Sequence, residues 1–337
     1  MFTAEQISTI SSILENCQTI LIIQADNPDA DSLGSALALE DFIQNLGKET
    51  ILYCGVDMPA YLRYMQGWDR VTSDFPNKFD CSIIVDASTP VLLEKITNIG
   101  AKGWIASKPC IVLDHHKEVD HVIDFAKISI NESAFSSTCE LLYWLGKSLK
   151  WDVNTANCEY LMAGILGDTQ NLTNDLATVQ TYKTMTEMIE LGVNRSELEE
   201  ARRQFNKMPD SIYYYKSELI KRTELHSNGQ IALVTVPQNE LNDFSPLYNP
   251  VALIQGDMQQ IDTVKIAIVF KVYDSGKITA ALRSNNDFPV AGNVAAHFGG
   301  GGHANASGFK ILEGKSIEQL KKEVLDYIET LLDKHNA

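Results

Sequence analysis

The feature that most constrains the fold is a series of short apolar runs separated by segments with helical spacing. Four runs in the first half hold apolar or β-branched residues between polar turns, at 19–24, 50–55, 81–86 and 110–116. Residues 33–47, between the first two runs, have helical spacing and end on a glycine. Repeated strand, helix and strand units form a parallel sheet with helices on both faces. The sequence therefore predicts an α/β fold with a doubly wound parallel sheet.

The pattern continues and then restarts further along the chain. Helices are predicted over 137–149 and 155–167, followed by a longer amphipathic stretch from 176 to 205. Further strands are predicted over 231–236, 264–274 and 277–284, with a closing helix over 316–335.

A change of composition divides the two sets of elements. Residues 196–222 are rich in charge and tyrosine, and Pro209 is predicted to interrupt the helical pattern there. We therefore predict a first domain over 1–195, a helical linker over 196–222 and a smaller α/β domain over 223–337; the motifs described below resemble those of a catalytic domain in the first and a substrate-binding domain in the second.

The charge balance excludes some classes of partner. The 337 residues include 28 Lys and Arg against 44 Asp and Glu, which gives a formal net charge of −16. Such a surplus repels polyanions, so we expect no binding to long duplex DNA and none to an anionic membrane. No apolar run reaches the ~18 residues of a membrane span, and no basic segment followed by an apolar one opens the chain. A local pocket for a small phosphate compound is not excluded.

The cysteines carry information about the cellular compartment. All six are far apart and most lie in apolar stretches, with no CxxC pair among Cys17, Cys54, Cys81, Cys110, Cys139 and Cys158. Disulfide frameworks and zinc ribbons need clustered cysteines. We therefore expect buried thiols and a reducing, cytoplasmic location.

Acidic and imidazole side chains fall where the predicted strands end. Asp29 and Asp31 lie in a turn fixed by Pro28, and the other such residues are Asp86, Asp114, His115, His116 and Asp168. Ligands of doubly wound sheets bind beyond the carboxyl ends of the strands, so these side chains are expected to converge. Four or five carboxylates in one crevice repel one another strongly unless cations neutralise them.

This set of donors indicates a metal and a reaction class. Oxygen ligands with a single imidazole favour Mn²⁺ or Mg²⁺ over metals that prefer thiolates. Two such ions about 3.5–4 Å apart can share a carboxylate, activate a water and clamp a phosphoryl group. The sequence therefore predicts phosphoryl hydrolysis.

The separated motifs resemble those of a known family. NPDADSLGS, the strand-end Asp86, the triplet Asp114-His115-His116 and GDT with Asp168 are similar, in order and spacing, to the four motifs of the DHH phosphoesterases. GGGGHANASG at 299–308 resembles the signature of the DHHA1 domain that accompanies them. Within the superfamily, the combination is most similar to the bifunctional oligoribonuclease and 3′-phosphoadenosine-5′-phosphate phosphatase group, also called nano-RNases.

The resemblance implies a role for each motif residue. It makes Asp29 a ligand of one Mn²⁺ ion and Asp31 a ligand of the other, with Mg²⁺ as an alternative metal. Asp86 would bridge both ions, and His115 and Asp168 would complete the second site. The residues implied to act in catalysis are His116, facing the substrate phosphate, the bridging Asp86, and Asp114, which would orient an imidazole.

One departure from the family pattern concerns the first metal. The family has a histidine three residues before the proline of its first motif, and here that residue is Ala25. We hypothesise that Asp26 helps to hold the first ion; Gln24 is the less favoured substitute, and a weak first site is the remaining alternative.

The glycine-rich segment is expected to bind substrate. A backbone without side chains can approach a phosphate closely and offer it N–H donors, which applies to Gly300, Gly301 and Gly302. The resemblance adds His303 and Arg283 as contacts to the phosphate or backbone of the substrate, and a guanidinium can donate two parallel hydrogen bonds to a phosphate.

The predicted function follows from these parts. We expect a metal-dependent phosphoesterase that uses a metal-activated hydroxide on short nucleotides: oligoribonucleotides of a few residues, linear dinucleotides or 3′-phosphoadenosine-5′-phosphate. The alternatives are a cyclic-dinucleotide phosphodiesterase, a pyrophosphatase-like hydrolase, and a nucleotide-binding sensor with weak turnover. A homodimer is left open.

Overall fold

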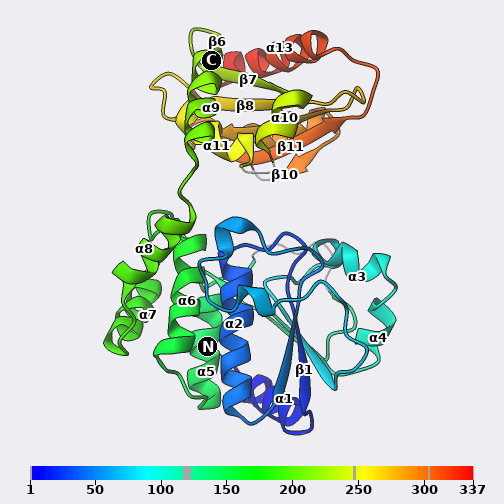
Figure 1. The fold of residues 1–337 in the computed structure, drawn as a ribbon, viewed down its shortest axis with the longest axis vertical. Coiled ribbons are helices and arrows are strands. Elements are labelled where there is room, and N and C mark those ends of the chain that lie inside the picture. Colours follow the sequence, from blue (N-terminus) through cyan, green and yellow to red (C-terminus); the bar gives the residue numbers. More distant parts are fainter. Residues whose placement is uncertain (1, 117–122, 246–247, 303, 337) are drawn as a thin grey trace. The chain divides into compact units, whose positions relative to one another are not determined.

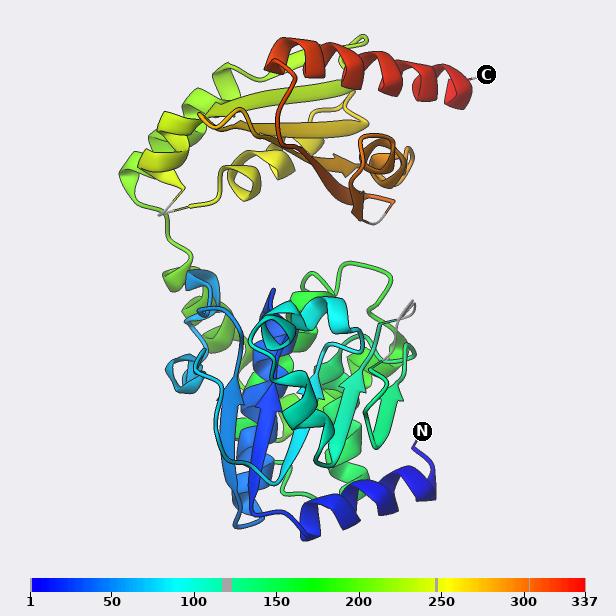
Figure 2. The same cartoon turned by 90° about the vertical axis from the view of Figure 1, so that its right-hand side faces the viewer.

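The structure is a computed structural model that describes residues 2–116, 123–245, 248–302 and 304–336. The chain divides into two compact units, Met1–Lys207 (unit 1) and Met208–Ala337 (unit 2). Each unit is built around its own sheet with helices on both faces (Figures 1 and 2). Among the described residues, no helix is both long enough and apolar enough to pass through a bilayer.

Unit 1 contains a sheet of five parallel strands in the order β2-β1-β3-β4-β5. The strands are β1 (Thr19–Ile23), β2 (Glu49–Tyr53), β3 (Cys81–Val85), β4 (Cys110–Asp114) and β5 (Ile128–Asn131). The helices are α1 (Ala4–Glu15), α2 (Ala30–Asn45), α3 (Glu94–Asn98), α4 (Lys102–Ala106), α5 (Thr138–Leu149), α6 (Thr155–Asp168), α7 (Val179–Glu190) and α8 (Arg195–Phe205). Short 3₁₀ turns lie at η1 (Ala60–Leu62), η2 (Trp68–Arg70) and η3 (Pro90–Leu93).

Burial on both faces explains why these strands are continuous apolar runs. In β1, Ile20 and Ile22 pack into the core under α2, α5 and α6, whereas Leu21 and Ile23 pack into the core under α3 and α4. Successive residues of a strand point to opposite faces, so both sets must be apolar when helices cover both sides. This confirms the predicted doubly wound sheet, and it places the carboxyl ends of β1, β3 and β4 next to one another.

Unit 2 has a mixed sheet in the order β10-β11-β9-β8-β7-β6, in which only the β7–β8 pair is parallel. Its strands are β6 (Glu224–His226), β7 (Ile231–Pro237), β8 (Ile266–Val272), β9 (Ile278–Ser284), β10 (Gly301–Gly302) and β11 (Ala306–Ile311). Its helices are α9 (Asp210–Lys221), α10 (Gln238–Phe244), α11 (Pro250–Gln259), α12 (Ala291–His297) and α13 (Ile317–Asn336). Helices α12 and α13 cover one face, and α9, α10 and α11 cover the other.

Two expectations about the middle of the chain need adjustment. The amphipathic stretch predicted over 176–205 is divided between two helices, α7 and α8. Gly192 has φ +105° between these helices, and the side chain of Asn194 accepts hydrogen bonds from the first N–H groups of α8. The predicted linker 196–222 is also divided, since α8 packs on α6 in unit 1 and α9 on α11 in unit 2. The domain boundaries themselves stay a prediction.

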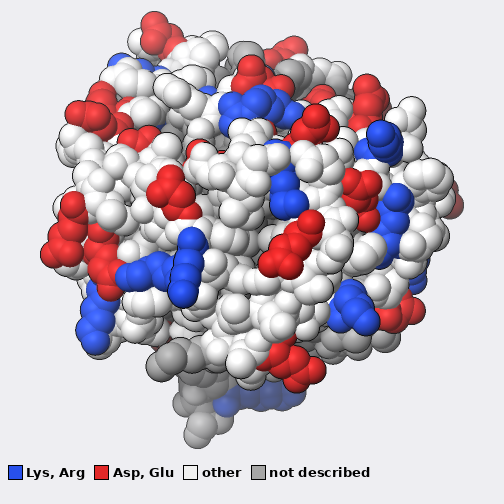
Figure 3. All heavy atoms as spheres, turned by 90° about the horizontal axis from the view of Figure 1, so that it is seen from below, with Lys and Arg blue, Asp and Glu red and all other residues white. Residues whose placement is uncertain are grey.

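On the face of the molecule that Figure 3 shows, the negative charge is not gathered into one patch. On the face shown in Figure 3, Lys and Arg side chains are interspersed with Asp and Glu, and no broad basic area is visible. All six cysteines are buried free thiols, as expected from their spacing.

Candidate metal centre

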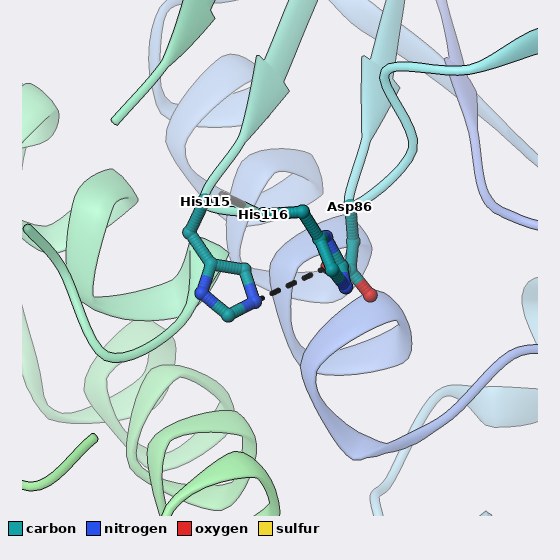
Figure 4. A group of neighbouring side chains, drawn as sticks. All are labelled: Asp86, His115 and His116. Carbon is teal, nitrogen blue, oxygen red and sulfur yellow. Dashed lines mark ion pairs between the residues drawn. The ribbon is translucent and has the colours of Figure 1, made fainter. Parts of the chain in front are cut away.

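The end of β4 provides the centre of an acidic cluster. His115 follows β4 directly and is buried, with 8% of its area exposed. Its Nε2 lies 3.0 Å from Oδ2 of Asp168, 3.8 Å from Oδ1 of Asp86 and 3.9 Å from Oδ2 of Asp31. Figure 4 shows both imidazole rings of the β4 loop beside Asp86 at the end of β3. The structure thus brings together residues that are far apart in the sequence.

Asp31 is held by the beginning of another helix. Its side chain is fully buried, and its two oxygens accept hydrogen bonds of 2.7 Å and 2.8 Å from the backbone N–H groups of Thr138 and Cys139. These N–H groups open α5, where the helix dipole favours an anion. Asp29 caps α2 in the same way, since one of its oxygens accepts from the N–H groups of Asp31 and Ser32 at 3.0 Å.

Asp86 adopts a backbone conformation that few residues with side chains tolerate. It is buried and has φ +55°, directly after β3. Its N–H donates to the carbonyl of Leu113 at 2.9 Å, and its Oδ1 accepts from the hydroxyl of Thr138 at 3.3 Å. A left-handed residue at a strand end costs of order 1–3 kcal/mol and persists where the surroundings fix it. The hydrogen bonds to Leu113 and Thr138 therefore hold this carboxylate beside His115 in spite of the strain.

Asp114 orients the second histidine. Its Oδ1 lies 2.7 Å from Nδ1 of His116, whose side chain is half exposed, and its Oδ2 accepts from the hydroxyl of Ser88. The amide of Asn131 donates to that same hydroxyl at 3.1 Å. Asp114 therefore holds the His116 ring with Nε2 left for other contacts. Sequence reasoning missed Ser88, although it lies two residues after Asp86 in the same strand-end segment.

Burial, together with neighbouring carboxylates, raises the pKa values of three aspartates in the cluster. Burial and the neighbouring carboxylates of Asp31 and Asp29 raise the pKa of Asp86 well above its usual value. Burial, with Asp31 next, raises the pKa of Asp168 to about 7. Partial desolvation and Asp31 also raise the pKa of Asp29. Each shift means that an ionised carboxylate is disfavoured here without a compensating cation.

The pKa values of the two histidines and of Asp114 are also shifted by the charges of the cluster. Burial alone would lower the pKa of His115, but the carboxylates of Asp168 and Asp31 raise it to about 9. The hydrogen bond to Asp114 raises the pKa of His116 despite partial burial. Burial would raise the pKa of Asp114, but the hydrogen bond to His116 outweighs it and lowers the pKa to about 2. The cluster attracts positive charge.

The donor set fits divalent cations. Two overlapping groups, Asp31 with His115 and Asp168, and Asp86 with His115 and His116, each place their ligand atoms within 4.8 Å of one another. Within the described part of the chain, the buried Nε2 of His115 has no hydrogen-bond partner, although carboxylates surround it. A bound cation would satisfy that nitrogen and neutralise the acids. Carboxylates with imidazole suit Mn²⁺ or Mg²⁺.

The two residues suggested as substitutes for the first-motif histidine, Asp26 and Gln24, differ in their contacts. The carboxylate of Asp26 accepts a hydrogen bond of 2.7 Å from the backbone N–H of Lys95 in α3, so it caps a helix here. Gln24 follows β1 and is fully buried, and neither amide atom has a hydrogen-bond partner among the described residues. Ala25 is buried as well. A role for Asp26 or Gln24 as a ligand stays a prediction.

The predicted substrate residues lie at one end of the sheet in unit 2. Arg283 is exposed on β9 and pairs with Ala306 of β11, and β11 in turn pairs with Gly301 and Gly302 of β10. His303 lies outside the described residues.

The structure requires glycine at some positions of this segment and not at others. A Cβ on Gly300 would lie 2.2 Å from the carbonyl oxygen of Gly308, and one on Gly302 would lie 2.6 Å from that of Ala306. Gly301 has open space around it. Close approach to β11 therefore requires glycine at 300 and 302, whereas the structure leaves room for a side chain at 301.

Comparison with protein families identifies both units. Residues 19–165 match the family model "DHH family, N-terminal domain", and residues 249–330 match the DHHA1 domain. The chain belongs to the DHH–DHHA1 family. This confirms the resemblance seen in the motifs, and with it the expected class of phosphoric ester hydrolase.

Named relatives of this DHH–DHHA1 chain cover nearly its full length. It is 28% identical over 94% of its length, and 98% of the other protein, to the "Probable bifunctional oligoribonuclease and PAP phosphatase NrnA" of Streptococcus mutans. It is 25% identical over 94% of its length, and 96% of the other protein, to the "Bifunctional oligoribonuclease and PAP phosphatase NrnA" of Bacillus subtilis. The crystal structure of an exopolyphosphatase-related protein from Bacteroides fragilis covers 98% of both chains with a TM-score of 0.84 at 22% identity, which supports the fold.

Proposed function

We propose that this chain is a metal-dependent phosphoesterase that hydrolyses short nucleotides. The observation that carries the proposal is the buried Nε2 of His115, which makes no hydrogen bond to any described residue although three carboxylate oxygens lie 3.0–3.9 Å away, in a chain of the DHH–DHHA1 family. Relatives named as oligoribonuclease and PAP phosphatase support short oligoribonucleotides, linear dinucleotides and 3′-phosphoadenosine-5′-phosphate as substrates. A surplus of negative charge disfavours long polyanions.

The site residues of unit 1 would act as metal ligands and as a proton donor. Two Mn²⁺ ions, or Mg²⁺, would supply Lewis-acid activation of water and neutralise charge on the phosphoryl oxygens. Asp29 would hold one ion; Asp31, His115 and Asp168 would hold the other; and Asp86 would contact both. His116, fixed through Nδ1 by Asp114, would present Nε2 to the phosphate and donate a proton near the leaving oxygen.

Unit 2 would bind the remainder of the nucleotide. Arg283 is exposed on β9 and can donate two parallel hydrogen bonds to a phosphate oxygen pair. The backbone around Gly301, where the structure leaves open space, can approach the substrate closely. His303 is assigned the same role by its position in the glycine-rich segment.

A second candidate function rests on the first motif. Ala25 is small, apolar and buried where the family has a histidine, which favours a nucleotide-binding sensor with weak turnover. A cyclic-dinucleotide phosphodiesterase is a further alternative, because a relative named "Cyclic-di-AMP phosphodiesterase GdpP", from Geobacillus thermodenitrificans, is 22% identical over 95% of this chain; the chain spans about half of that protein.

One titration separates these candidates. The purified chain is incubated with increasing Mn²⁺ and four substrates side by side: 3′-phosphoadenosine-5′-phosphate, linear diadenylate, cyclic diadenylate and pyrophosphate. We expect turnover of one or both of the first two. A sensor would bind linear diadenylate in Mn²⁺ and release no product, and absence of any turnover by folded, metal-loaded protein would exclude the hydrolase.

A further inference from the structure

A cavity of about 200 Å³ in unit 1 lies next to the acidic cluster. It is open to solvent on one side and is lined by η1, the start of α2, the end of α6, the segment after α6, and α8. Its lining includes Ala30 and Gly167, which are the chain neighbours of Asp29 and Asp168. The hydroxyl of Tyr61, another lining residue, donates to the carbonyl of Pro28 at 3.1 Å. A molecule in this cavity would therefore contact residues that adjoin two predicted metal ligands in the chain.

The backbone that lines the cavity after Asp168 is strained. Gln170, Asn171 and Leu172 are three successive residues with left-handed φ values of +50°, +62° and +67°. Each such residue other than glycine costs of order 1–3 kcal/mol, and such costs concentrate at ligand sites. The segment is fixed from within, because the N–H of Asn171 donates to Leu166 at 2.8 Å and that of Leu172 to the hydroxyl of Thr169 at 3.1 Å. The conformation places Gln170 and Asn171 in the cavity wall.

The chemistry of the wall selects a flat, polar-edged ligand. Tyr61 and Tyr64 contribute aromatic rings, and Gln170, Asn171 and Asn206 contribute amides. Aromatic rings stack on nucleobases, and amides hydrogen-bond their edges.

A phosphate fits this wall less well than a base does. Arg202 also lines the cavity, but its Nε and a terminal guanidinium nitrogen each donate to the carboxylate of Glu199 at 2.8 Å. The fork of the guanidinium is thus occupied by an acid, and Glu199 itself would repel an anion. The flat face of the guanidinium is left for stacking. The volume is also below the 300–1,000 Å³ typical of pockets for whole drug-sized ligands, which suits one base rather than a dinucleotide.

We propose that this cavity binds the base of the nucleotide whose phosphate is held at the acidic cluster. The proposal rests on the proposed function and deepens it, because it assigns base recognition to the catalytic unit. It explains why a strained segment begins two residues after Asp168: the turn that follows this predicted metal ligand places Gln170 and Asn171 in the cavity wall.

The test fills the cavity from α8 and removes its cation. Leu198→Trp adds bulk at the wall, and Arg202→Met removes the guanidinium. Arg203→Met is the matched control, because Arg203 also contacts Glu199, at 3.1 Å, but is exposed and does not line the cavity. Thermal melts establish that each variant folds.

Two readouts separate this inference from the proposed function. In calorimetry with Mn²⁺, we expect Leu198→Trp to weaken AMP binding at least tenfold and Arg202→Met about fivefold, with inorganic phosphate binding changed far less and Arg203→Met equal to wild type. In kinetics, the loss for linear diadenylate should exceed the loss for bis(p-nitrophenyl) phosphate by at least tenfold. Equal AMP binding by wild type and Leu198→Trp, absent AMP binding, or equal losses for AMP and phosphate would overturn the base site. If Leu198→Trp weakens AMP binding as expected but the wild type hydrolyses no substrate, only the proposed function is overturned.

Discussion

Replacing Asp168 by Asn should stabilise the metal-free protein and destabilise it relative to wild type when metal is present. The pKa of Asp168 rises from 3.8 to about 7 in the folded chain. At 1.36 kcal/mol per pKa unit, this rise corresponds to about 4 kcal/mol of unfavourable free energy when the carboxyl is ionised. The variant also removes the negative charge that lies 3.0 Å from Nε2 of protonated His115, which offsets part of this gain. We therefore expect a net gain of about 2 kcal/mol in the free energy of unfolding at pH 8.

The pH dependence has a definite sign. A raised carboxyl pKa means that the folded state binds more protons than the unfolded state, so the stability of the metal-free wild type falls as pH rises from about 4 through about 7. Asp86 and His115 have raised pKa values too, and their contributions run in the same direction. The advantage of Asp168→Asn should accordingly be largest at pH 8 and shrink toward pH 4.

The assay is thermal unfolding in EDTA and in excess Mn²⁺. For a unit of this size, about 2 kcal/mol corresponds to a rise in Tm of about 4–8 °C in EDTA. In Mn²⁺ the order should reverse, because a cation at 100 times its Kd stabilises the wild type by about 2.7 kcal/mol. Asp175→Asn, which removes an exposed carboxylate, is the control and should not change Tm in either condition. A lower Tm for Asp168→Asn in EDTA at pH 8 would refute the reasoning.

Three further predictions concern the other site residues. Asp26→Ala should retain less metal by elemental analysis if Asp26 compensates for the absent histidine; unchanged occupancy would eliminate it as a ligand and leave it as the helix cap seen here. Gly301→Ala should keep the Tm of the wild type but raise KM for linear diadenylate several-fold. Gly302→Ala should lower Tm by several degrees, because its Cβ would meet β11. Equal Tm values for the two variants would contradict this prediction. Asp114→Asn should lower kcat at least tenfold and shift the pH profile, because His116 loses the acceptor that raises its pKa; an unchanged pH profile would show that Asp114 does not act through His116.

The sequence predicted much of unit 1 because its signals are local. Apolar runs such as β1 must be buried on both faces, and that requirement is visible in five residues. The division of 176–205 into two helices was missed even though Gly192 and Asn194 are ordinary end and start signals for helices. β5, at Ile128–Asn131, was also missed, because a four-residue edge strand carries little pattern.

The residues of the site could be predicted from the sequence, but the backbone contacts that hold them in place could not. Strand-end acids converge because parallel strands share an edge, which sequence alone implies. The N–H groups of Thr138 and Cys139 that hold Asp31 come from a helix more than a hundred residues away. Every residue except proline has a backbone N–H, so the sequence does not indicate which ones will lie beside Asp31. Likewise, the reason for glycine at 300 and 302 is the neighbouring strand β11, which was not predicted.

We propose that the acidic cluster holds two divalent ions with Asp86 shared between them. The most direct measurement is the number of Mn²⁺ ions bound per chain, by elemental analysis and equilibrium dialysis, for wild type and Asp86→Ala, with thermal melts to establish folding. The account predicts about two ions per wild-type chain, and fewer than one per Asp86→Ala chain together with loss of nearly all hydrolysis. Folded wild type without bound metal, or Asp86→Ala with both ions and robust turnover, would contradict it.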